Sequence, residues 1–134
     1  MNARYVRNPV ALIVNSHHAV RRAVCDRIRA SFANFRLWEA ASIDDALCLL
    51  DGLAVDIVVL EGDSKGINGL KGTRAILERA PRVSVIVMAG FSEPTCRSAA
   101  SEAGAMAFVS KRTINSELIQ VLADFLNHRP PPTG

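Results

Sequence analysis

Short runs of apolar, mostly β-branched residues alternate along this chain with longer segments in which apolar residues recur every three or four positions. The runs are Val10–Val14, Phe35–Ala41, Asp56–Leu60, Val83–Met88 and Met106–Val109, of which Phe35–Ala41 is the weakest. A continuous apolar run suits a strand that is buried on both faces, as in a parallel sheet covered by helices. The alternation therefore predicts repeated strand–helix units around one parallel sheet.

The segments between and after the runs carry the signals of helices. We predict helices at about His17–Phe32, Asp44–Leu50, Leu70–Ala80, Glu93–Ala103 and Ile114–Asn127. Ser42 stands where an N-cap is expected, and Gly52 and Gly104 stand where a C′ glycine would end a helix. The core stripe of the first helix is predicted to be Val20, Val24, Ile28 and Phe32. Strict alternation of strands and helices predicts a flavodoxin-like, doubly wound (βα)5 α/β fold whose five-stranded parallel sheet has the order 2-1-3-4-5.

Length and composition fit one globular domain. The chain has 134 residues, of which 49% are apolar and 22% are charged. We expect an N-terminal arm at 1–8, the folded domain at 9–127 and a proline-rich tail or linker at 128–134. No apolar stretch approaches the ~18 residues that a membrane span needs, and the run after the basic N-terminus is too short for a signal peptide. We therefore predict a cytoplasmic protein with no membrane partner.

The cysteines and the charges argue against a metal centre and against nucleic-acid binding by this domain. Cys25, Cys48 and Cys96 are scattered and lack metal-ligand spacing, so we expect each to act as a small hydrophobe. The net charge is only +3, and no aromatic residues accompany the arginines of the first predicted helix to stack on bases. Those arginines are predicted to form a solvated helix face made of Arg21, Arg22, Arg27 and Arg29.

Polar residues follow several of the predicted strands. Asn15 and Ser16 come directly after the first strand, and Glu61 comes directly after the third. The carboxyl ends of parallel strands share one edge of the sheet, and ligands bind where the strand order reverses, which here lies between the first and third strands. The fourth and fifth strands bring Ala89 and Lys111 to the same rim. The predicted fold therefore gathers these five residues into one candidate site.

These spacings resemble the receiver domain of bacterial two-component response regulators over about Val10–Asn127. The most specific stretches are Asp56–Glu61, Gly66–Leu70 and Glu102–Lys111, and the last is similar to receivers of the NarL/LuxR type. In that family an acidic pair after the first strand and an aspartate after the third hold Mg²⁺. The aspartate accepts a phosphoryl group, and a hydroxyl and a lysine after the fourth and fifth strands respond to it. Phe108 matches the family's aromatic switch position, although a ring on a strand is more often a core residue.

The positions that match this family pattern are degenerate here. Asn15 and Ser16 replace the acidic pair, Glu61 replaces the aspartate, Ala89 replaces the hydroxyl residue, and only Lys111 is kept. Mg²⁺ prefers carboxylates, and few remain at this rim, so we expect no magnesium ion and no other cofactor. The carboxylate of Glu61 lies one methylene further out than that of an aspartate. A misplacement of ~1 Å can lower the rate of such a reaction about a hundredfold.

We therefore predict an atypical receiver that is not an enzyme and that signals without phosphorylation, through protein–protein contact or dimerisation. The resemblance further implies regulation of transcription through a DNA-binding domain beyond this chain. Two alternatives remain open. One is a working phosphoacceptor that uses Glu61 or Asp63, and the other is a sensor of a small ligand bound beside Asn15, Ser16 and Lys111.

The last predicted helix, Ile114–Asn127, has more apolar residues than one core stripe needs. Ile119 and Leu126 fall outside the main stripe, which makes them candidates for an interface. A slightly wide stripe that is simply buried explains them equally well. In receivers, dimer or partner contacts commonly use the first and last helices, or the face formed here by 93–103, 106–109 and 114–127. We expect a homodimer or a protein partner at one of these faces.

Overall fold

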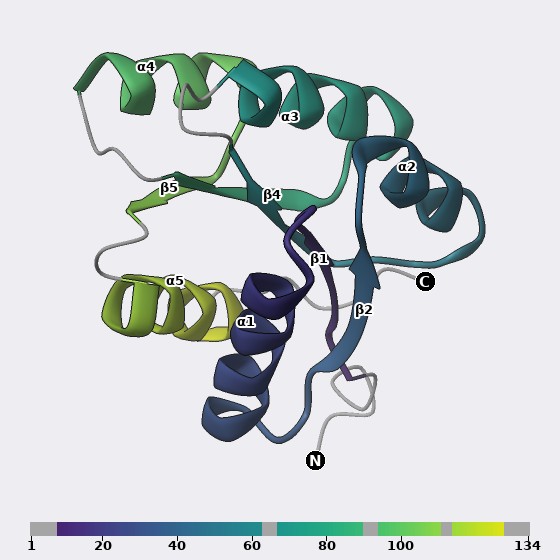
Figure 1. Cartoon of the computed structure of the whole chain (residues 1–134), viewed down its shortest axis with the longest axis vertical. Helices are drawn as coiled ribbons and strands as arrows, with labels where there is room; N and C mark the ends of the chain where they lie inside the picture. Colours follow the sequence, from purple (N-terminus) through teal and green to yellow (C-terminus); the bar gives the residue numbers. More distant parts are fainter. Residues whose placement is uncertain (1–7, 63–66, 90–93, 111–113, 128–134) are drawn as a thin grey trace.

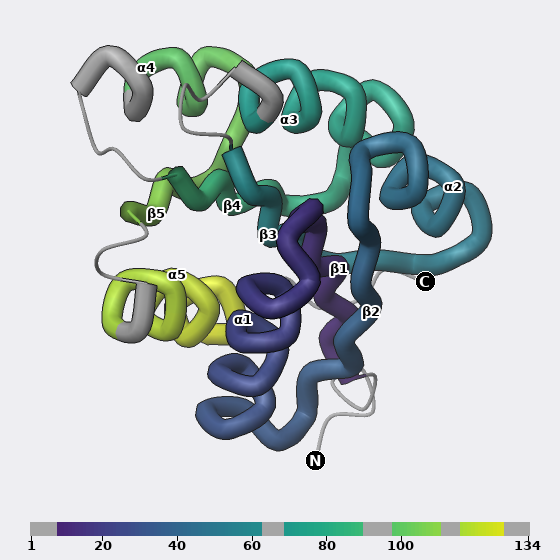
Figure 2. The backbone as a smooth tube through the Cα atoms, in the orientation of Figure 1, coloured from purple at the N-terminus to yellow at the C-terminus, as the bar shows by residue number. Residues whose placement is uncertain are grey.

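A computed structural model describes residues 8–62, 67–89, 94–110 and 114–127. Within these residues five parallel strands form one sheet in the order β2-β1-β3-β4-β5, as predicted (Figure 1). The strands are β1 (Val10–Val14), β2 (Arg36–Ala40), β3 (Ile57–Glu61), β4 (Ser84–Ala89) and β5 (Ala107–Ser110). The helices are α1 (His18–Ser31), α2 (Ile43–Gly52), α3 (Ile67–Arg79), α4 (Pro94–Ala103) and α5 (Ile114–Asn127). The path of the backbone confirms the predicted alternation of strands and helices (Figure 2).

The helices lie in two layers, with α1 and α5 on one face of the sheet and α2, α3 and α4 on the other (Figure 1). Two apolar cores result. The core under α1 and α5 includes Ala11, Ile13, Ile28, Leu118 and Leu122. The core under α2 and α3 includes Leu12, Val14, Ala46, Leu60 and Ile76. Successive residues of β1 therefore enter opposite cores, which is why an unbroken apolar run is needed there.

The helix ends follow local signals in two cases and depart from them in one. Ser42 caps α2 as predicted, because its Oγ accepts a hydrogen bond of 3.1 Å from the backbone N–H of Asp45. Gly104 follows α4 with φ +104°, a conformation in which a Cβ would be strained. The prediction for Gly52 is wrong, because α2 runs through Gly52 and ends on the extended backbone of Leu53. Helix α3 begins at Ile67, earlier than the predicted Leu70.

The stripe predicted for α1 is partly wrong. Val24 and Ile28 are buried, but Val20 is 41% exposed because it lies in the first turn, at the rim of the sheet. Cys25 is buried instead, and burial raises the pKa of its thiol. Cys48 is exposed on α2 and is not the buried hydrophobe that we predicted, while the side chain of Cys96 lies outside the described residues.

The open edge of the sheet at β2 carries an exposed aromatic ring. Trp38 is 44% exposed, although its register partner Leu12 on β1 is fully buried. Strand β2 has a neighbour on one side only, so one flank of its backbone stays open. In the part of the chain that the structure describes, no helix has the length and apolar character that crossing a bilayer requires.

Candidate functional site at the carboxyl edge of the sheet

Asn15 and Glu61 meet at the point where the strand order reverses. Val14 of β1 pairs in register with Leu60 of β3, so the residues that follow them lie side by side. Asn15 is 2% exposed, and its Nδ2 donates a hydrogen bond of 2.8 Å to Oε2 of Glu61. Its Oδ1 accepts a hydrogen bond of 2.7 Å from the backbone N–H of His17, at the start of α1. The two hydrogen bonds fix the orientation of the amide.

This orientation does not suit a magnesium ion. The amide presents its N–H to the carboxylate of Glu61, while its carbonyl oxygen is used at the start of α1. Mg²⁺ needs oxygen ligands and is held in proteins mainly through carboxylates and water. Among the residues that the structure describes, no group of three or more His, Cys, Asp or Glu side chains could hold a metal ion. The described part of this rim therefore does not fit the ion that the resemblance implies; Asp63 lies outside it.

The structure places the other predicted site residues as follows. Ser16 is exposed at the rim beside Asn15, and Ala89 is buried at the end of β4. Ala89 has no hydroxyl, although the family resemblance expects one at this position, and its register partner on β5 is Ser110. Lys111 lies outside the described residues, and so its approach to Glu61 stays a prediction.

The aromatic switch position and the two possible interface residues are half-buried. Phe108 packs against the core under α2 and α3. Leu126 packs against the core under α1 and α5, so it does not lie outside the buried stripe as we predicted. Ile119 is also half-buried. A role for Ile119 and Leu126 in an interface stays a prediction.

Arg21 on α1 links the residue that follows β1 to β2, and the sequence analysis did not predict this role. Its Nη1 donates a hydrogen bond of 2.7 Å to the backbone oxygen of Asn15, and its Nε lies 2.9 Å from Oε1 of Glu39 on β2. Arg22 donates a second bond of 2.7 Å to Oε2 of Glu39. Arg21 is only 12% exposed, so the prediction of a solvated face is wrong for this residue, although Arg22, Arg27 and Arg29 are exposed.

The two arginines lower the pKa of the Glu39 carboxyl. Desolvation alone would raise its pKa, but the hydrogen bonds and charges of Arg21 and Arg22 outweigh that effect and lower the pKa below its ordinary value. The same pairing raises the pKa of Arg22. Glu39 therefore stays ionised, and Arg21 is held where it can bind the backbone of Asn15.

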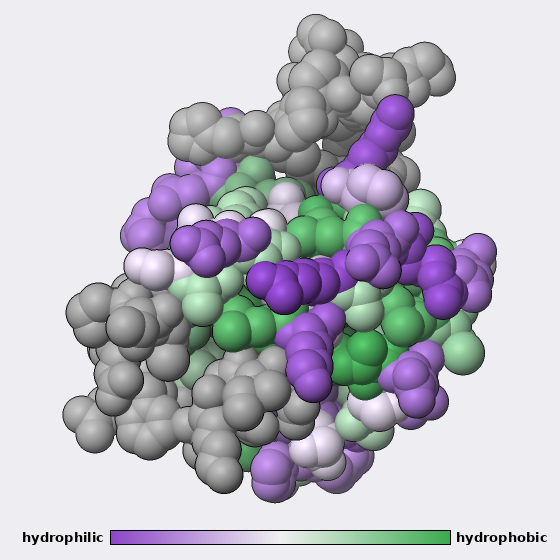
Figure 3. All heavy atoms as spheres, turned by 90° about the horizontal axis from the view of Figure 1, so that it is seen from above, coloured by the Kyte–Doolittle hydropathy of each residue, from purple (hydrophilic) through white to green (hydrophobic). Residues whose placement is uncertain are grey.

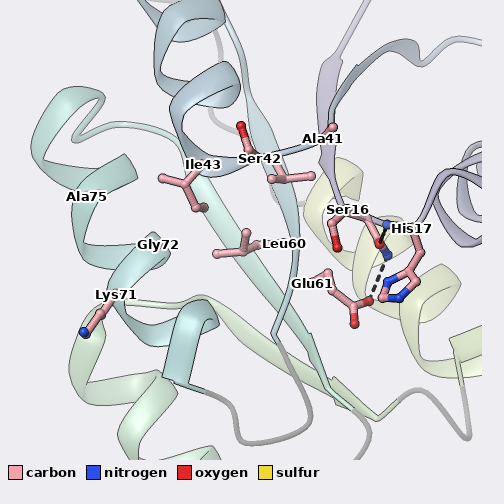
Figure 4. A pocket seen from close by; sticks show the side chains of 12 residues that line it. Ser16, His17, Ala41, Ser42, Ile43, Leu60, Glu61, Lys71, Gly72 and Ala75 are labelled. Carbon is pink, nitrogen blue, oxygen red and sulfur yellow. Dashed lines mark hydrogen bonds between the residues drawn. The ribbon is translucent and has the colours of Figure 1, made fainter.

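A cavity of about 470 Å³ opens beside this pair, between β1, β3 and the helices α2 and α3 (Figure 4). Its walls comprise Val14, Asn15, Ser16, His17, Ala41, Ser42, Ile43, Leu60, Glu61, Lys71, Gly72 and Ala75. The side chains of Ile43 and Leu60 point into the middle of the cavity, Glu61 lies at the end nearest His17, and Lys71 extends away (Figure 4). Sequence reasoning missed the part of this site formed by α2 and α3, because no motif marks it.

Comparison with known proteins finds one matching family model and several curated relatives. Residues 11–123 match the family model for the response regulator receiver domain. The glycerol metabolism activator of Pseudomonas putida is 27% identical over 119 residues, 87% of this chain and 53% of that protein. Response regulator UvrY of Escherichia coli is 28% identical over 112 residues, 83% of this chain and 51% of that protein. This chain therefore spans about half the length of these curated relatives.

A solved structure extends the comparison to three dimensions. The LuxR family DNA-binding response regulator from Silicibacter pomeroyi superposes with a TM-score of 0.77 and 28% sequence identity. The alignment covers 89% of this chain and 92% of that one. The fold described above is therefore shared with that structure.

Proposed function

Because this chain belongs to the response regulator receiver domain family and is of the LuxR type, we propose that it is an atypical receiver that signals without phosphorylation. In this proposal the domain keeps one conformation at the carboxyl edge and acts in the cytoplasm through protein–protein contact. The observation that carries the proposal is the hydrogen bond of 2.8 Å between Asn15 and Glu61.

The bond between Asn15 and Glu61 supports the loss of metal-assisted chemistry. Phosphoryl transfer depends on positioning and on cations that neutralise the charge developing on the transferred group. The Asn15 amide brings no negative charge to attract such a cation, and its oxygen already accepts a bond from His17. Glu61 is half-buried, and its Oε2 accepts a hydrogen bond from the amide.

The output of the proposed receiver follows from its relatives. The alignments cover about half of each of the two curated relatives named above, and one of these is a glycerol metabolism activator. We propose that this domain acts on transcription through a DNA-binding domain outside the described chain. Dimer or partner contacts would use α1 with α5, or the face formed by α4, β5 and α5, where Ile119 is half-buried.

Phosphorylation in solution tests the proposal directly. The chain is incubated with acetyl phosphate and millimolar Mg²⁺, and its intact mass is measured. We expect no stable gain of a phosphoryl group. A gain that is lost in Glu61→Gln or in Asp63→Asn would overturn the proposal and identify the acceptor. Glu78→Gln is the matched control, because Glu78 is an exposed carboxylate on α3, away from the rim residues.

A complementary variant restores negative charge to the rim. Asn15→Asp replaces the amide donor by a second carboxylate beside Glu61, which removes a hydrogen bond and adds repulsion. We expect the free energy of unfolding at pH 7 to fall by about 2–4 kcal/mol without divalent ions. Repulsion raises the pKa of the carboxylate pair in the folded state, so the loss should shrink as the pH falls through that raised pKa and should be gone below about 4, the ordinary carboxyl value. Urea titrations with and without Mg²⁺ measure this loss.

Added Mg²⁺ should restore part of the stability of Asn15→Asp and should leave the parent chain unchanged. An equal stabilisation of both proteins by Mg²⁺ would show that the parent rim already binds the ion. That result would contradict the proposed role of Asn15.

A further inference from the structure

The outer edge of β2 has backbone groups that no other described strand uses. Arg36 donates its N–H to the backbone oxygen of Pro9 at 2.8 Å, and the oxygen of Ala40 accepts a bond of 3.0 Å from the residue after β1. Alternate residues of a strand turn their backbone groups to opposite sides, so those of Leu37 and Glu39 point away from β1. In the part of the chain that the structure describes, these two N–H and two C=O groups have no hydrogen-bond partner. They are a template for a further strand.

The side chains of β2 do not protect this edge. Open edges are usually protected by proline, lysine or a bulge, and the sequence of β2 has no proline or lysine. It carries the exposed ring of Trp38 instead, on the face of the sheet that α2 and α3 cover. On the surface above α3 and α4, by contrast, hydrophilic side chains separate the apolar areas from one another (Figure 3). The β2 edge therefore combines an aromatic side chain with unused backbone groups.

The two ends of β2 carry opposite charges. Arg36 is exposed at the start of the strand and forms no ion pair with another described residue. Asp44 and Asp45 are exposed in the first turn of α2, shortly after the strand ends. A second β2 that runs antiparallel brings its acidic end to Arg36, whereas a parallel copy would place two Arg36 side chains together. Because like charges directly opposite each other are unfavourable, the charge pattern favours an antiparallel copy.

We propose that β2 pairs with β2 of a second copy of this chain, antiparallel and with Trp38 on the two-fold axis. In this register Leu37 of each copy lies opposite Glu39 of the other, and each such pair exchanges two backbone hydrogen bonds. The register uses all the outward backbone groups of both residues. It also brings the two Trp38 rings together, at a pair without backbone bonds, where opposite side chains lie closest. The carboxylate of Glu39 stays bound to α1 through its arginine partners.

The proposed pairing goes beyond the proposed function and does not depend on it. It uses the edge of the sheet, and the helical faces expected to carry dimer or partner contacts remain available. Two symmetric copies would form one continuous sheet, and the contact closes on itself because the same surface is used twice. A short strand with one aromatic residue gives a small interface, so we expect weak association with a Kd of about 100 μM.

Sedimentation equilibrium and hydrogen exchange of the full chain test the pairing together. The chain is measured at concentrations from about 10 to 1,000 μM, on both sides of the expected Kd. We expect a monomer–dimer equilibrium in which the amide protons of Leu37 and Glu39 exchange more slowly as the dimer forms. The amide of Arg36, which is bound to Pro9 in each copy, should change little. A chain that stays monomeric over this range would overturn the inference.

Charge variants test the antiparallel orientation. Arg36→Glu should raise the Kd of the dimer at least fivefold, and Asp45→Lys in the same chain should recover part of that loss. Arg82→Glu is the matched control, because Arg82 is also exposed, lies just before β4 and gives the same change in net charge. It should leave the Kd unchanged. Equal weakening by Arg36→Glu and Arg82→Glu would mean that net charge decides the association, and would overturn the inference.

A cysteine on the proposed axis tests the register. Residues opposite each other without backbone bonds have Cα atoms about 4.5 Å apart, within reach of a disulfide. In a chain with Cys48→Ser and Cys96→Ser, Trp38→Cys should therefore give a covalent dimer on mild oxidation. Arg36→Cys is the control and should stay monomeric, because position 36 faces position 40 of the other copy. Cross-linking of Arg36→Cys as efficient as that of Trp38→Cys would overturn the proposed register.

The remaining outcomes separate this inference from the proposed function. A chain that gains a phosphoryl group and still dimerises through β2 would contradict the proposed function alone. A dimer in which Leu37 and Glu39 exchange as fast as in the monomer would point to the helical faces and overturn the β2 pairing alone. Slow exchange of both amides at every concentration would show that a segment of the same chain covers the edge, which would also overturn the pairing.

Discussion

The carboxyl edge of the sheet has two corners that are built in opposite ways. The anchored corner, formed by Asn15, Arg21 and Glu39, is cross-linked by side-chain hydrogen bonds between β1, α1 and β2. The hollow corner, formed by Ile43, Leu60, Gly72 and Ala75, surrounds a cavity with apolar walls. The two corners share the sheet and lie on either side of the first strand.

The difference between the two corners indicates that they respond differently to substitution. At the anchored corner, each polar group of Asn15 is held by a partner, so that corner has one preferred arrangement. At the hollow corner, apolar side chains such as Ile43 border the cavity, and we expect them to have space to move. We expect the anchored corner to respond to loss of charge and hydrogen bonds, and the hollow corner to tolerate changes in side-chain volume better than the core does.

Truncation of buried leucines gives the largest expected effect. Leu12 is fully buried within the core under α2 and α3, so Leu12→Ala should lower the free energy of unfolding by about 4 kcal/mol. Leu60 is equally apolar but already borders the cavity, so Leu60→Ala should cost only about 2 kcal/mol. Chemical denaturation measures both values. Equal losses would mean that the walls of the hollow corner are packed as tightly as the core.

Two glycines of α3 offer a sharper comparison with smaller effects. A Cβ on Gly69 would lie 2.9 Å from the Cα of Gly62, which is backbone and cannot move aside cheaply. A Cβ on Gly72 would lie 2.6 Å from Cδ1 of Ile43, the end of a flexible side chain next to the cavity. Gly69→Ala should cost about 1–2 kcal/mol, whereas Gly72→Ala should be near neutral, because the helix itself gains about 0.5–1 kcal/mol from alanine.

Gly52→Ala is the control for both glycine variants. Gly52 lies at the end of α2 with no atom within 4 Å of a built Cβ, so alanine should be neutral or slightly stabilising there. Thermal unfolding of the three variants measures the differences. A loss for Gly72→Ala as large as that for Gly69→Ala would show that Ile43 has no space to move.

Removal of the charge on Glu39 tests the anchored corner with the smallest expected effect. Glu39→Gln should lower the free energy of unfolding at pH 7 by about 1 kcal/mol, because the bond from Arg21 loses its ionic character. The pKa of Glu39 is lowered in the folded protein, so its ionised form stabilises the fold above the ordinary value of 4.5. That stabilisation is lost as the pH falls through the lowered pKa.

The difference between Glu39→Gln and the parent chain should therefore vanish in strong acid. Urea titrations across pH measure it. A difference that is constant with pH would show that packing rather than charge anchors Arg21.

The fold could be predicted from the sequence because its signals repeat along the chain. Unbroken apolar strands such as Val10–Val14 predicted a two-sided sheet, and the structure has that sheet in the predicted order. Local signals also identified Ser42 and Gly104 as helix ends. They failed at Gly52, because the turn that follows α2 is made by extended backbone at Leu53 and needs no positive φ.

The candidate site was predictable only where it follows from strand ends. Asn15 and Glu61 meet because the register of parallel strands brings them together, which the strand order alone implies. The role of Arg21 could not be predicted from the sequence, because Arg21 lies on α1 and its partner Glu39 lies 18 residues away on β2. The cavity could not be predicted from the sequence either, because its volume depends on how closely α2 and α3 pack, and no residue pattern encodes that packing.

The exposed indole on β2 allows tryptophan fluorescence to report on the edge of the sheet. Trp38 is the single tryptophan of the chain and is 44% exposed. Its emission maximum should therefore move little when the protein unfolds, because the ring is already in contact with water. A molecule that covered the β2 edge would move the emission to shorter wavelength, so fluorescence in this protein reports events at its border rather than the melting of its interior.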